Sequence, residues 1–328
     1  MCWDLVRVFV TGSTGFIGTA VVKELVSAGH SVVGLTRSDK GQEQLKSQGA
    51  KPLRGAIEDL ELFKKTAFES DAVIHLAFIH DLANFLSACE TDRAAIKALG
   101  SALAASVAAA KVTGASADRA LVITSGTSGL APKTPGEPAT EDDQGSLTNP
   151  ISVARNPSET VCLDFAKQGV RASVVRLPPT TYGPGTSGFM SLLIGTALQK
   201  GVSGYISGEE EDKYSWSACH RDDAATLYRL AMEKAGQSGG PSIFNAVSQQ
   251  SVHLKDIAQS VGKPLDLPVT GIQPDWAAEH FGWFQVIMTM KNVVSSAKTR
   301  EALGWTPTSP PLLEHLPIIV DFAKSQTH

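Results

Sequence analysis

The chain has 328 residues, of which 42% are hydrophobic and 19% are charged, and its formal net charge at pH 7 is −4. This length suits one large α/β domain with a smaller appendage. The charge balance gives no indication of a nucleic-acid-binding surface, a basic membrane-binding face or a disordered acidic tail. The expected partner is therefore a small molecule, with neither nucleic acid nor a membrane as a partner.

Four cysteines are scattered along the chain without a Cys-x-x-Cys pair: Cys2, Cys89, Cys162 and Cys219. This spacing argues against a disulfide framework and a structural zinc site, and it predicts reduced, mostly buried thiols. The first four residues lead directly into the first strand, which leaves no room for a signal peptide, and no apolar run is expected to reach membrane-spanning length. A cytoplasmic location follows.

The strongest pattern is a glycine-rich turn at residues 11–18, with the sequence TGSTGFIG. An apolar run precedes it, a helical pattern follows as far as Gly29, and a second apolar run covers residues 31–35, so this segment predicts a βαβ unit. Glycines at this spacing let the backbone approach a pyrophosphate, and the helix N-terminus favours the anion. The predicted cofactor contacts in the turn are Gly12, Thr14, Gly15, Phe16, Ile17 and Gly18.

The second strand ends in Arg37 and Ser38, where a dinucleotide-binding enzyme meets the adenosine ribose. An acid at this place would accept from a ribose 2′-hydroxyl, whereas an arginine beside a hydroxyl suits a 2′-phosphate, which it can bind through two parallel hydrogen bonds. These two residues favour NADP(H) over NAD(H) as the cofactor. The alternative is that Arg37 is a solvated loop charge and that Asp39 contacts the ribose.

Two later strands extend the binding crevice. Residues 51–54 predict a short strand, after which Ile57 can lie against the adenine. The apolar, β-branched run at residues 71–77 predicts a buried strand whose C-terminal end opens onto the crevice, which makes Leu76 and Ala77 cofactor contacts. The side chains that follow beside the crevice are Phe78, His80 and Asp81.

The middle of the chain continues the alternation of helix and strand. An alanine-rich helix is expected to end at Gly114, and its small side chains suit close helix packing or the contact of a homodimer. A strand at residues 120–124 ends in hydroxyls that include Ser125 and Thr127. Residues 130–150 predict a surface loop, and a helix follows from about residue 157 to 168. Another strand covers residues 170–177 and exits at Pro178, a further predicted cofactor contact.

From residue 178 the alternation of parallel strand and helix loosens. We expect a Rossmann-type doubly wound parallel sheet in residues 1–177 and a smaller C-terminal α/β substrate-binding lobe in residues 178–328, with some segments of the lobe returning to the core of the sheet. An aromatic segment between Trp276 and Met288 either caps an apolar substrate or belongs to the core.

These motifs resemble the extended and atypical branch of the short-chain dehydrogenase/reductase superfamily, the NAD-dependent epimerase/dehydratase-like proteins. The resemblance spans nearly the whole chain and rests on residues 11–18, 73–77, 176–178 with 182–185, 220–224 and 300–307. It implies a Rossmann domain with a C-terminal substrate lobe, NAD or NADP as cofactor, and a catalytic Ser or Thr with a Tyr-x-x-x-Lys pair.

The residues that match this pair depart from it. Family members often read Asn-Pro-Tyr-x-x-x-Lys-x-x-x-Glu, and the matching stretch, residues 149–159, has Ile151 at the tyrosine position and Arg155 at the lysine position. Isoleucine has no proton to transfer, and the pKa of arginine is too high for it to shuttle a proton near neutral pH. Arg155 can still hydrogen-bond the nicotinamide ribose.

Other side chains must therefore supply the chemistry. The family's serine position falls at Gly126, so Ser125 or Thr127 has to supply the hydroxyl. Histidine titrates near working pH, and His80, beside the crevice, is the acid/base candidate. His75 and His220 are the alternative candidates for the acid/base, although a single histidine is more often a structural residue. No spacing of His or acidic residues predicts a metal site.

Three functional hypotheses follow. The first is an NADP(H)-dependent oxidoreductase that acts on a small organic carbonyl, hydroxyl, imine or activated double bond. The second is a non-redox isomerase, dehydratase or cyclase on the same scaffold, which the missing tyrosine favours. The third is a regulator that senses NADP without catalysis.

Overall fold

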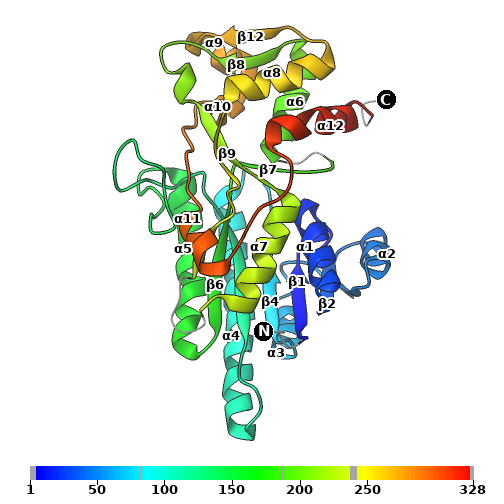
Figure 1. The fold of residues 1–328 in the computed structure, drawn as a ribbon. Helices are drawn as coiled ribbons and strands as arrows, with labels where there is room; N and C mark the ends of the chain where they lie inside the picture. The colour runs from blue at the N-terminus through cyan, green and yellow to red at the C-terminus, as the bar shows by residue number, and fades with distance from the viewer. Residues whose placement is uncertain (1–4, 82, 186–187, 237–241, 326–328) are drawn as a thin grey trace.

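The structure, a computed structural model, describes residues 5–81, 83–185, 188–236 and 242–325. Cys2 lies outside the described residues. A parallel sheet of seven strands runs through the lower part of the molecule in Figure 1, in the order β10-β6-β5-β4-β1-β2-β3. Its strands are β1 (Arg7–Thr11), β2 (Ser31–Thr36), β3 (Lys51–Arg54), β4 (Ala72–His75), β5 (Ala120–Gly126), β6 (Arg171–Leu177) and β10 (Ile243–Asn245).

Helices cover both faces of this sheet, so its central strands are buried and almost entirely apolar. One hydrophobic cluster joins the sheet to α1 (Phe16–Ser27), α2 (Asp39–Ser47) and α7 (Arg221–Lys234). A second cluster joins the other face to α3 (Leu60–Phe68), α4 (Phe85–Thr113), α5 (Pro150–Leu163) and the 3₁₀ turn η1 (Asp164–Gln168). The expected α/β fold with a doubly wound parallel sheet is confirmed.

Most of the remaining elements lie above the C-terminal ends of the sheet strands, whereas α11 (Ala297–Leu303) lies beside the large sheet and contributes Leu303 to its first hydrophobic cluster (Figure 1). They form a three-stranded sheet, β11-β9-β7, a two-stranded sheet, β12-β8, and a third hydrophobic cluster. The strands are β7 (Thr180–Tyr182), β8 (Ser203–Ile206), β9 (Ser215–His220), β11 (Gln249–His253) and β12 (Val269–Ile272). The helices are α6 (Gly188–Lys200), η2 (Glu211–Lys213), α8 (Leu254–Leu265), α9 (Pro274–Phe281), η4 (Gly282–Phe284), α10 (Gln285–Met288), α11 (Ala297–Leu303) and α12 (Leu312–Ser325).

Some elements that follow residue 178 in the sequence pack with the large sheet. β10 pairs with β6 as the edge strand of the large sheet, and α7 packs beside α1 in the same layer. β10 and α7 follow residue 178 in the sequence but lie with the large sheet in space. The division of the chain at residues 177 and 178 stays a prediction.

Two expectations from the sequence are wrong. The helix expected from about residue 157 begins at Pro150, because Asn149 caps it by accepting from the backbone N–H groups of Ile151 and Ser152 at 2.9 and 3.3 Å. The chain also contains an apolar helix of membrane-spanning length: α4 has 29 residues, and 61% of its most apolar window is buried inside the protein. That burial is typical of the core helix of an α/β protein.

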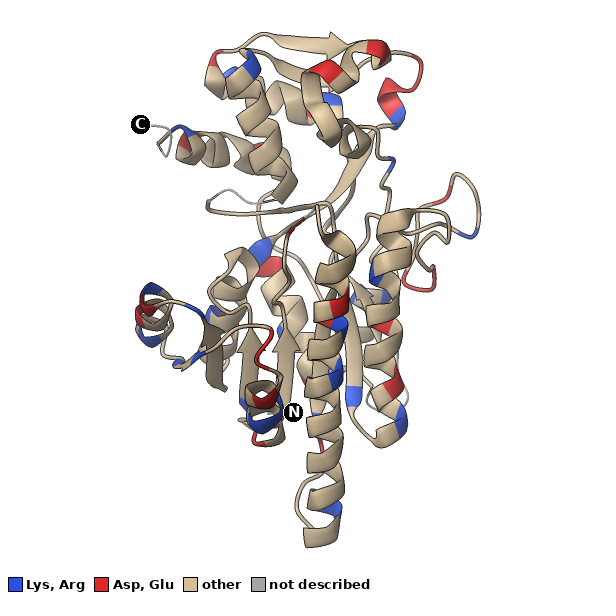
Figure 2. Ribbon diagram, turned by 180° about the vertical axis from the view of Figure 1, so that it is seen from behind, with Lys and Arg blue, Asp and Glu red and all other residues tan. Residues whose placement is uncertain are grey.

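Residues of both charges are interspersed along the ribbon in both parts of the molecule in the rear view of Figure 2. The long helix α4, which runs from the middle of this view to its lower end, is mostly uncharged. Alternating signs of this kind create no extended field of one sign on this face.

The turn between β1 and α1 has the closest backbone approach in the large sheet. Gly12 has a φ of +63°, and a Cβ placed on it would lie 2.7 Å from the backbone nitrogen of Ala77. A Cβ on Gly18 would lie 2.0 Å from the carbonyl oxygen of Gly12. Only glycine fits at either position, because the turn is pressed between the end of β4 and the first turn of α1.

Replacing Gly12 with alanine should lower the free energy of unfolding by about 2–5 kcal/mol, from the cost of a left-handed L-residue and of overpacking. The matched control is Gly195→Ala, since Gly195 lies within α6 and an added Cβ would meet nothing within 4 Å. That control should raise the stability by about 0.5–1 kcal/mol. Urea unfolding measures both changes, and equal stabilities of the two variants would contradict the close approach at Gly12.

Candidate active site

The glycine turn forms a cradle with an open helix N-terminus. The backbone N–H of Gly15 donates to the carbonyl of Gly12 at 3.0 Å, which closes the turn. Gly15 is the N-cap residue of α1, and no side chain caps this helix end. The first N–H groups of α1 are therefore available to an anion, as a dinucleotide pyrophosphate requires. The predicted contacts Thr14, Phe16 and Ile17 are all partly accessible around this cradle.

Two hydroxyls that the sequence reading missed hold the turn in place. Ser13 is completely buried and donates to the carbonyl of Leu35 at 2.7 Å. Thr11 Oγ1 accepts from the backbone N–H groups of Leu76 and Ala77, each at 3.2 Å. These bonds bring the turn and the end of β4 together, which places the predicted contacts Leu76 and Ala77 beside the cradle.

The ribose end of the predicted cofactor site lies after β2. Arg37 is exposed, and no ion pair joins it to another residue within the described ranges. The side chain of Ser38 caps α2 by accepting from the N–H of Gly41 at 3.1 Å. Asp39, the alternative ribose ligand, accepts from Arg54 at 2.6 Å. Asp39 therefore has a cationic partner in Arg54, whereas Arg37 has no ion pair among the described residues.

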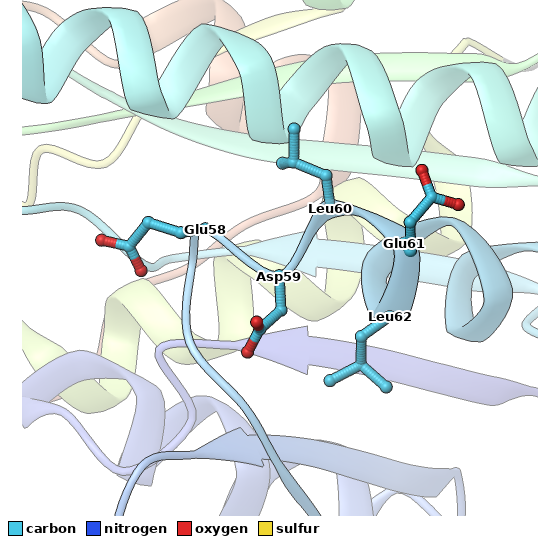
Figure 3. Close-up of a pocket in the computed structure, with 5 residues that line it drawn as sticks. All are labelled: Glu58, Asp59, Leu60, Glu61 and Leu62. Atoms are coloured by element: carbon cyan, nitrogen blue, oxygen red, sulfur yellow. The ribbon is translucent and has the colours of Figure 1, made fainter.

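A hollow of about 540 Å³ is lined by the five residues that follow the predicted adenine contact, Ile57, in the sequence, and Ile57 itself is 8% exposed and does not line it. Figure 3 shows that the five residues lining the hollow come from the start of α3 and the loop before it, and that their side chains point in different directions. Three of them are the carboxylates Glu58, Asp59 and Glu61. Their charge disfavours a phosphate here but leaves room for an uncharged base.

A buried chain of polar groups leads from the turn into α4. Because Thr11 Oγ1 already accepts two N–H groups, its hydroxyl proton is free to point to Nδ1 of His75 at 2.7 Å. Nδ1 then acts as an acceptor, and the ring hydrogen of a neutral His75 lies on Nε2. Nε2 faces Oδ1 of Asp92 at 3.4 Å, and both side chains are 1% exposed.

Asp92 contacts the other two ionisable groups of this site, His75 and Arg155. Its Oδ2 accepts from Ser158 Oγ at 2.7 Å and from Nη1 of Arg155. Burial raises the pKa of the Asp92 carboxyl, but the contact with His75 and the positive charge of Arg155 outweigh it, so the pKa lies below its ordinary value. The sequence held a signal for this residue, because Asp92 is a lone acid within the buried stripe of an alanine-rich helix.

Arg155 lies at the C-terminal edge of the sheet. Nη2 donates to the carbonyl of Thr124 at 2.7 Å, and the guanidinium lies over the Phe78 ring, 4.3 Å from its centroid. The contacts with Asp92 and Thr124 use one hydrogen on each terminal nitrogen. The other N–H groups of Arg155 make no hydrogen bond within the described part of the chain, so they can serve a ligand.

The two candidate hydroxyls have different surroundings. Thr127 is completely buried, and its Oγ1 lies 3.4 Å from Oδ1 of Asn292. Ser125 is 7% exposed, and no hydrogen bond holds its side chain among the described residues. Ser125 is therefore the more available of the two. Pro178, the predicted contact after β6, is buried.

Ile151 and His80 both precede Arg155 in the sequence, and both are accessible. Ile151, the second residue of α5, is 45% exposed. His80 is exposed, and its Nδ1 lies 3.2 Å from the carbonyl of Phe78, so Nδ1 carries a hydrogen and Nε2 is free. Its ring packs edge-on against Phe78 at 5.3 Å, beside the ring under Arg155.

The other residues considered from the sequence have structural contacts. His220 caps α7 through Nδ1, which accepts from the N–H of Asp222 at 3.2 Å. The sequence predicts that the aromatic segment at residues 276–288 either caps an apolar substrate or belongs to the core. Some of its side chains are in the core, and others are accessible. Phe281, Phe284 and Met288 are buried, whereas Trp276 and Trp283 are 63% and 54% exposed.

Within residues 5–81, 83–185, 188–236 and 242–325, no three His, Cys, Asp or Glu side chains form a group that could hold a metal ion. Cys89, Cys162 and Cys219 are free and buried. Burial raises the pKa of the Cys162 and Cys219 thiols, so both stay protonated.

Replacing Arg155 with methionine leaves the Asp92 carboxylate buried without its cation. We expect the free energy of unfolding at pH 7 to fall by about 3–5 kcal/mol. The double variant Arg155→Met, Asp92→Asn removes the charge and keeps an acceptor for Ser158, so it should recover much of this loss. Urea unfolding of the three proteins checks this, and a single variant as stable as the original chain would contradict the ion pair.

The same ion pair gives a pH dependence. Because the folded pKa of Asp92 lies below its ordinary value, the ionised carboxylate stabilises the folded state above about pH 4, and this contribution is lost as the pH falls through the folded pKa. The stability difference between the original chain and Arg155→Met should therefore narrow in acid.

Comparison with known proteins agrees with this geometry. The chain matches the NAD dependent epimerase/dehydratase family over residues 8–246. It is 40% identical over 316 residues to an uncharacterised protein of Schizosaccharomyces pombe, a match that covers 94% of this chain and 98% of the relative.

Two solved structures have the same fold at low sequence identity. The UDP-glucose 4-epimerase of Thermotoga maritima, solved with UDP-glucose, has a TM-score of 0.73 and 20% identity over 98% of this chain and 100% of that one. The dTDP-glucose 4,6-dehydratase DesIV of Streptomyces venezuelae, solved with NAD bound, has a TM-score of 0.75 and 16% identity over 97% of each chain. The matched span, the full-length relative and the glycine cradle lead to one conclusion: the chain belongs to the NAD-dependent epimerase/dehydratase family.

Proposed function

We propose that the protein is an NADP(H)-dependent oxidoreductase that acts on a small organic carbonyl, hydroxyl, imine or activated double bond. The observation that carries the proposal is the pair of features at the two ends of the predicted cofactor site. At one end α1 has an open N-terminus above the cradle of Gly12 and Gly18. At the other end Arg37 is free while Arg54 holds Asp39.

The preference for a 2′-phosphate rests on charge. A dinucleotide with a 2′-phosphate brings two further negative charges to the end of β2, and a planar guanidinium can bind it through parallel hydrogen bonds. A cofactor with a free 2′-hydroxyl needs an acceptor instead, and the nearest carboxylate, Asp39, already accepts from Arg54 at 2.6 Å. NADP(H) is therefore the better match.

The chemistry must work without a tyrosine at the position of Ile151. When bound, NADPH supplies a hydride to the carbonyl carbon, and the oxygen then needs hydrogen-bond donors and a proton. The free N–H groups of Arg155 and the hydroxyl of Ser125 are the donors that we assign to the oxygen. We assign the proton to the imidazolium form of His80: its accessible Nε2–H gives the proton to the oxygen, while Nδ1–H keeps its hydrogen bond to the carbonyl of Phe78.

Arg37 tests the cofactor preference. Replacing Arg37 with alanine should weaken NADP+ binding by roughly tenfold or more, the effect of one lost charged hydrogen bond, and should leave NAD+ binding nearly unchanged. Lys46→Ala is the control. Lys46 is also a cation, but it lies in the last turn of α2, at the end of that helix away from Arg37. Calorimetric titration measures both affinities, and equal losses for the two cofactors would remove the preference.

His80 tests the proton donor. In a screen of aldehydes and ketones with NADPH, His80→Phe keeps a ring beside Phe78 but removes the acid, so kcat/KM should fall by about 10²-fold or more. Asp81→Asn is the control, since an asparagine can still accept from the backbone N–H of Ala83 as Asp81 does at 3.0 Å. If His80→Phe and Asp81→Asn are equally active, His80 is not the acid.

A second candidate function, a non-redox isomerase, dehydratase or cyclase, is favoured by one observation. Ile151 presents an exposed apolar side chain where the family pattern expects a tyrosine. Turnover without any change in nicotinamide absorbance, at a rate that survives removal of the cofactor, would support this function over the first. Cofactor binding with no turnover of any substrate would support a sensing role. A cytoplasmic location and a homodimer stay predictions.

A further inference from the structure

Arg221 occupies an unusual position beside the cofactor turn. It is the first residue of α7, and its guanidinium lies over the ring of Phe16, 4.9 Å from the centroid. Phe16 is the first residue of α1, the helix whose N-terminus faces the predicted pyrophosphate. Because α1 and α7 pack side by side, a residue 205 positions away in the chain reaches the edge of the cradle.

The guanidinium of Arg221 lacks the hydrogen bonds that a buried cation needs. Its side chain is only 20% exposed, and its Nε is buried with no hydrogen-bond partner. The nearest carboxylate oxygen, Oδ1 of Asp222, lies 3.7 Å from Nε, beyond hydrogen-bond length, on a side chain that is 61% exposed. The buried Nε–H without an acceptor is costly, and the terminal N–H groups make no hydrogen bond with the described residues, so an anion bound here would satisfy donors that the protein itself leaves unused.

The fold makes room for Arg221. A Cβ on Gly183, in the turn after β7, would lie 2.8 Å from Cγ and 2.9 Å from Cδ of Arg221. The next glycine, Gly185, faces the Phe16 ring at 3.9 Å from its hypothetical Cβ. The segment around these glycines therefore fits closely against both the arginine stem and the aromatic ring, and holds the guanidinium beside the turn.

A second polar group without a partner lies on the same side. His315, from α12, is 8% exposed, and its Nε2 is buried without a hydrogen bond among the described residues. Its ring lies 5.1 Å from that of His220, the residue before Arg221. Burial lowers the pKa of His315, the charge of Arg221 lowers it further, and the carboxylate of Asp222 raises it, so His315 and Arg221 lie within electrostatic range of each other.

We propose that Arg221 binds the diphosphate of the dinucleotide from the side of the C-terminal part, beside the N-terminus of α1, with His315 as a neighbouring donor. This inference rests on the proposed function, because it identifies a further ligand of the same cofactor. It assigns the binding of one anion to two helices, α1 and α7, that lie side by side in the fold. A phosphate carried by the substrate has the same chemistry, so the experiment must separate the two sources.

The test compares Arg221→Gln with the original chain in calorimetric titrations with NADP+ and with 2′-AMP. NADP+ contains the diphosphate, whereas 2′-AMP contains only the adenosine and the 2′-phosphate. We expect the variant to bind NADP+ roughly tenfold to a hundredfold more weakly, the range for a lost charged hydrogen bond, and to bind 2′-AMP as the original chain does. Arg221→Lys keeps a cation without the planar fork and should be intermediate.

Arg300→Gln is the matched control. Arg300 also lies over an aromatic ring, that of Trp305 at 5.4 Å, but it belongs to α11 and donates toward the carbonyls of Val247 and Ser248. Its removal should leave NADP+ affinity unchanged. Unchanged 2′-AMP binding shows that Arg221→Gln is folded; if that variant does not fold, Arg221→Lys alone carries the comparison.

Each other outcome has a defined meaning. Equal NADP+ affinity in Arg221→Gln and the original chain overturns the inference and leaves the proposed function intact. If inorganic pyrophosphate then binds the NADP+-saturated original chain but not the variant, the anion belongs to the substrate and the cofactor assignment is wrong. If the original chain binds neither NADP+ nor NAD+, the proposed function fails, and pyrophosphate binding that does not depend on Arg221 overturns the anion site as well.

Discussion

The hydroxyl of Thr11 is the interaction on which the candidate site depends. It lies at the end of β1 and accepts from two successive N–H groups at the end of β4, and it also contacts His75. A parallel ladder alone would leave the two strand ends free to separate where the chain turns away. Thr11 keeps them together, so the glycine turn stays pressed against Ala77, and the cradle keeps the shape that requires glycine at position 12.

The contacts that begin at Thr11 continue to Arg155, which stands where the family pattern expects a lysine. His75 faces Asp92, and Asp92 holds Arg155. An arginine there differs from a lysine because its charge does not titrate near neutral pH and its plane is fixed by two acceptors. Arg155 can therefore orient and polarise a ligand but cannot pass on a proton. This separates the binding of a cofactor from proton transfer, and it explains why an acid such as His80 has to be sought elsewhere in the crevice.

Sequence reasoning found the features that depend on neighbouring residues. The glycine turn, the buried strands and the end of α4 at Gly114 all follow from local patterns. The start of α5 was missed because a loop rich in Pro and Gly hides an Asn-Pro cap, although Asn149 is a strong capping residue. The contacts of Asp92 with Arg155 and of Arg221 with Phe16 could not be predicted, since each joins residues more than 60 positions apart and depends on how whole elements pack.

The position of Arg221 also bears on how the two parts of the molecule work together. Its helix, α7, belongs to the layer of the large sheet, yet the residues that enclose its side chain come from the turn after β7 and from α12. An anion bound between α1 and Arg221 would therefore contact both parts at once. Because such a ligand would bind the folded chain through contacts from both parts, it would stabilise the packing of the two parts against each other. In this proposal a single guanidinium and the aromatic ring beneath it join the start of α1, the start of α7 and the turn after β7 at one point.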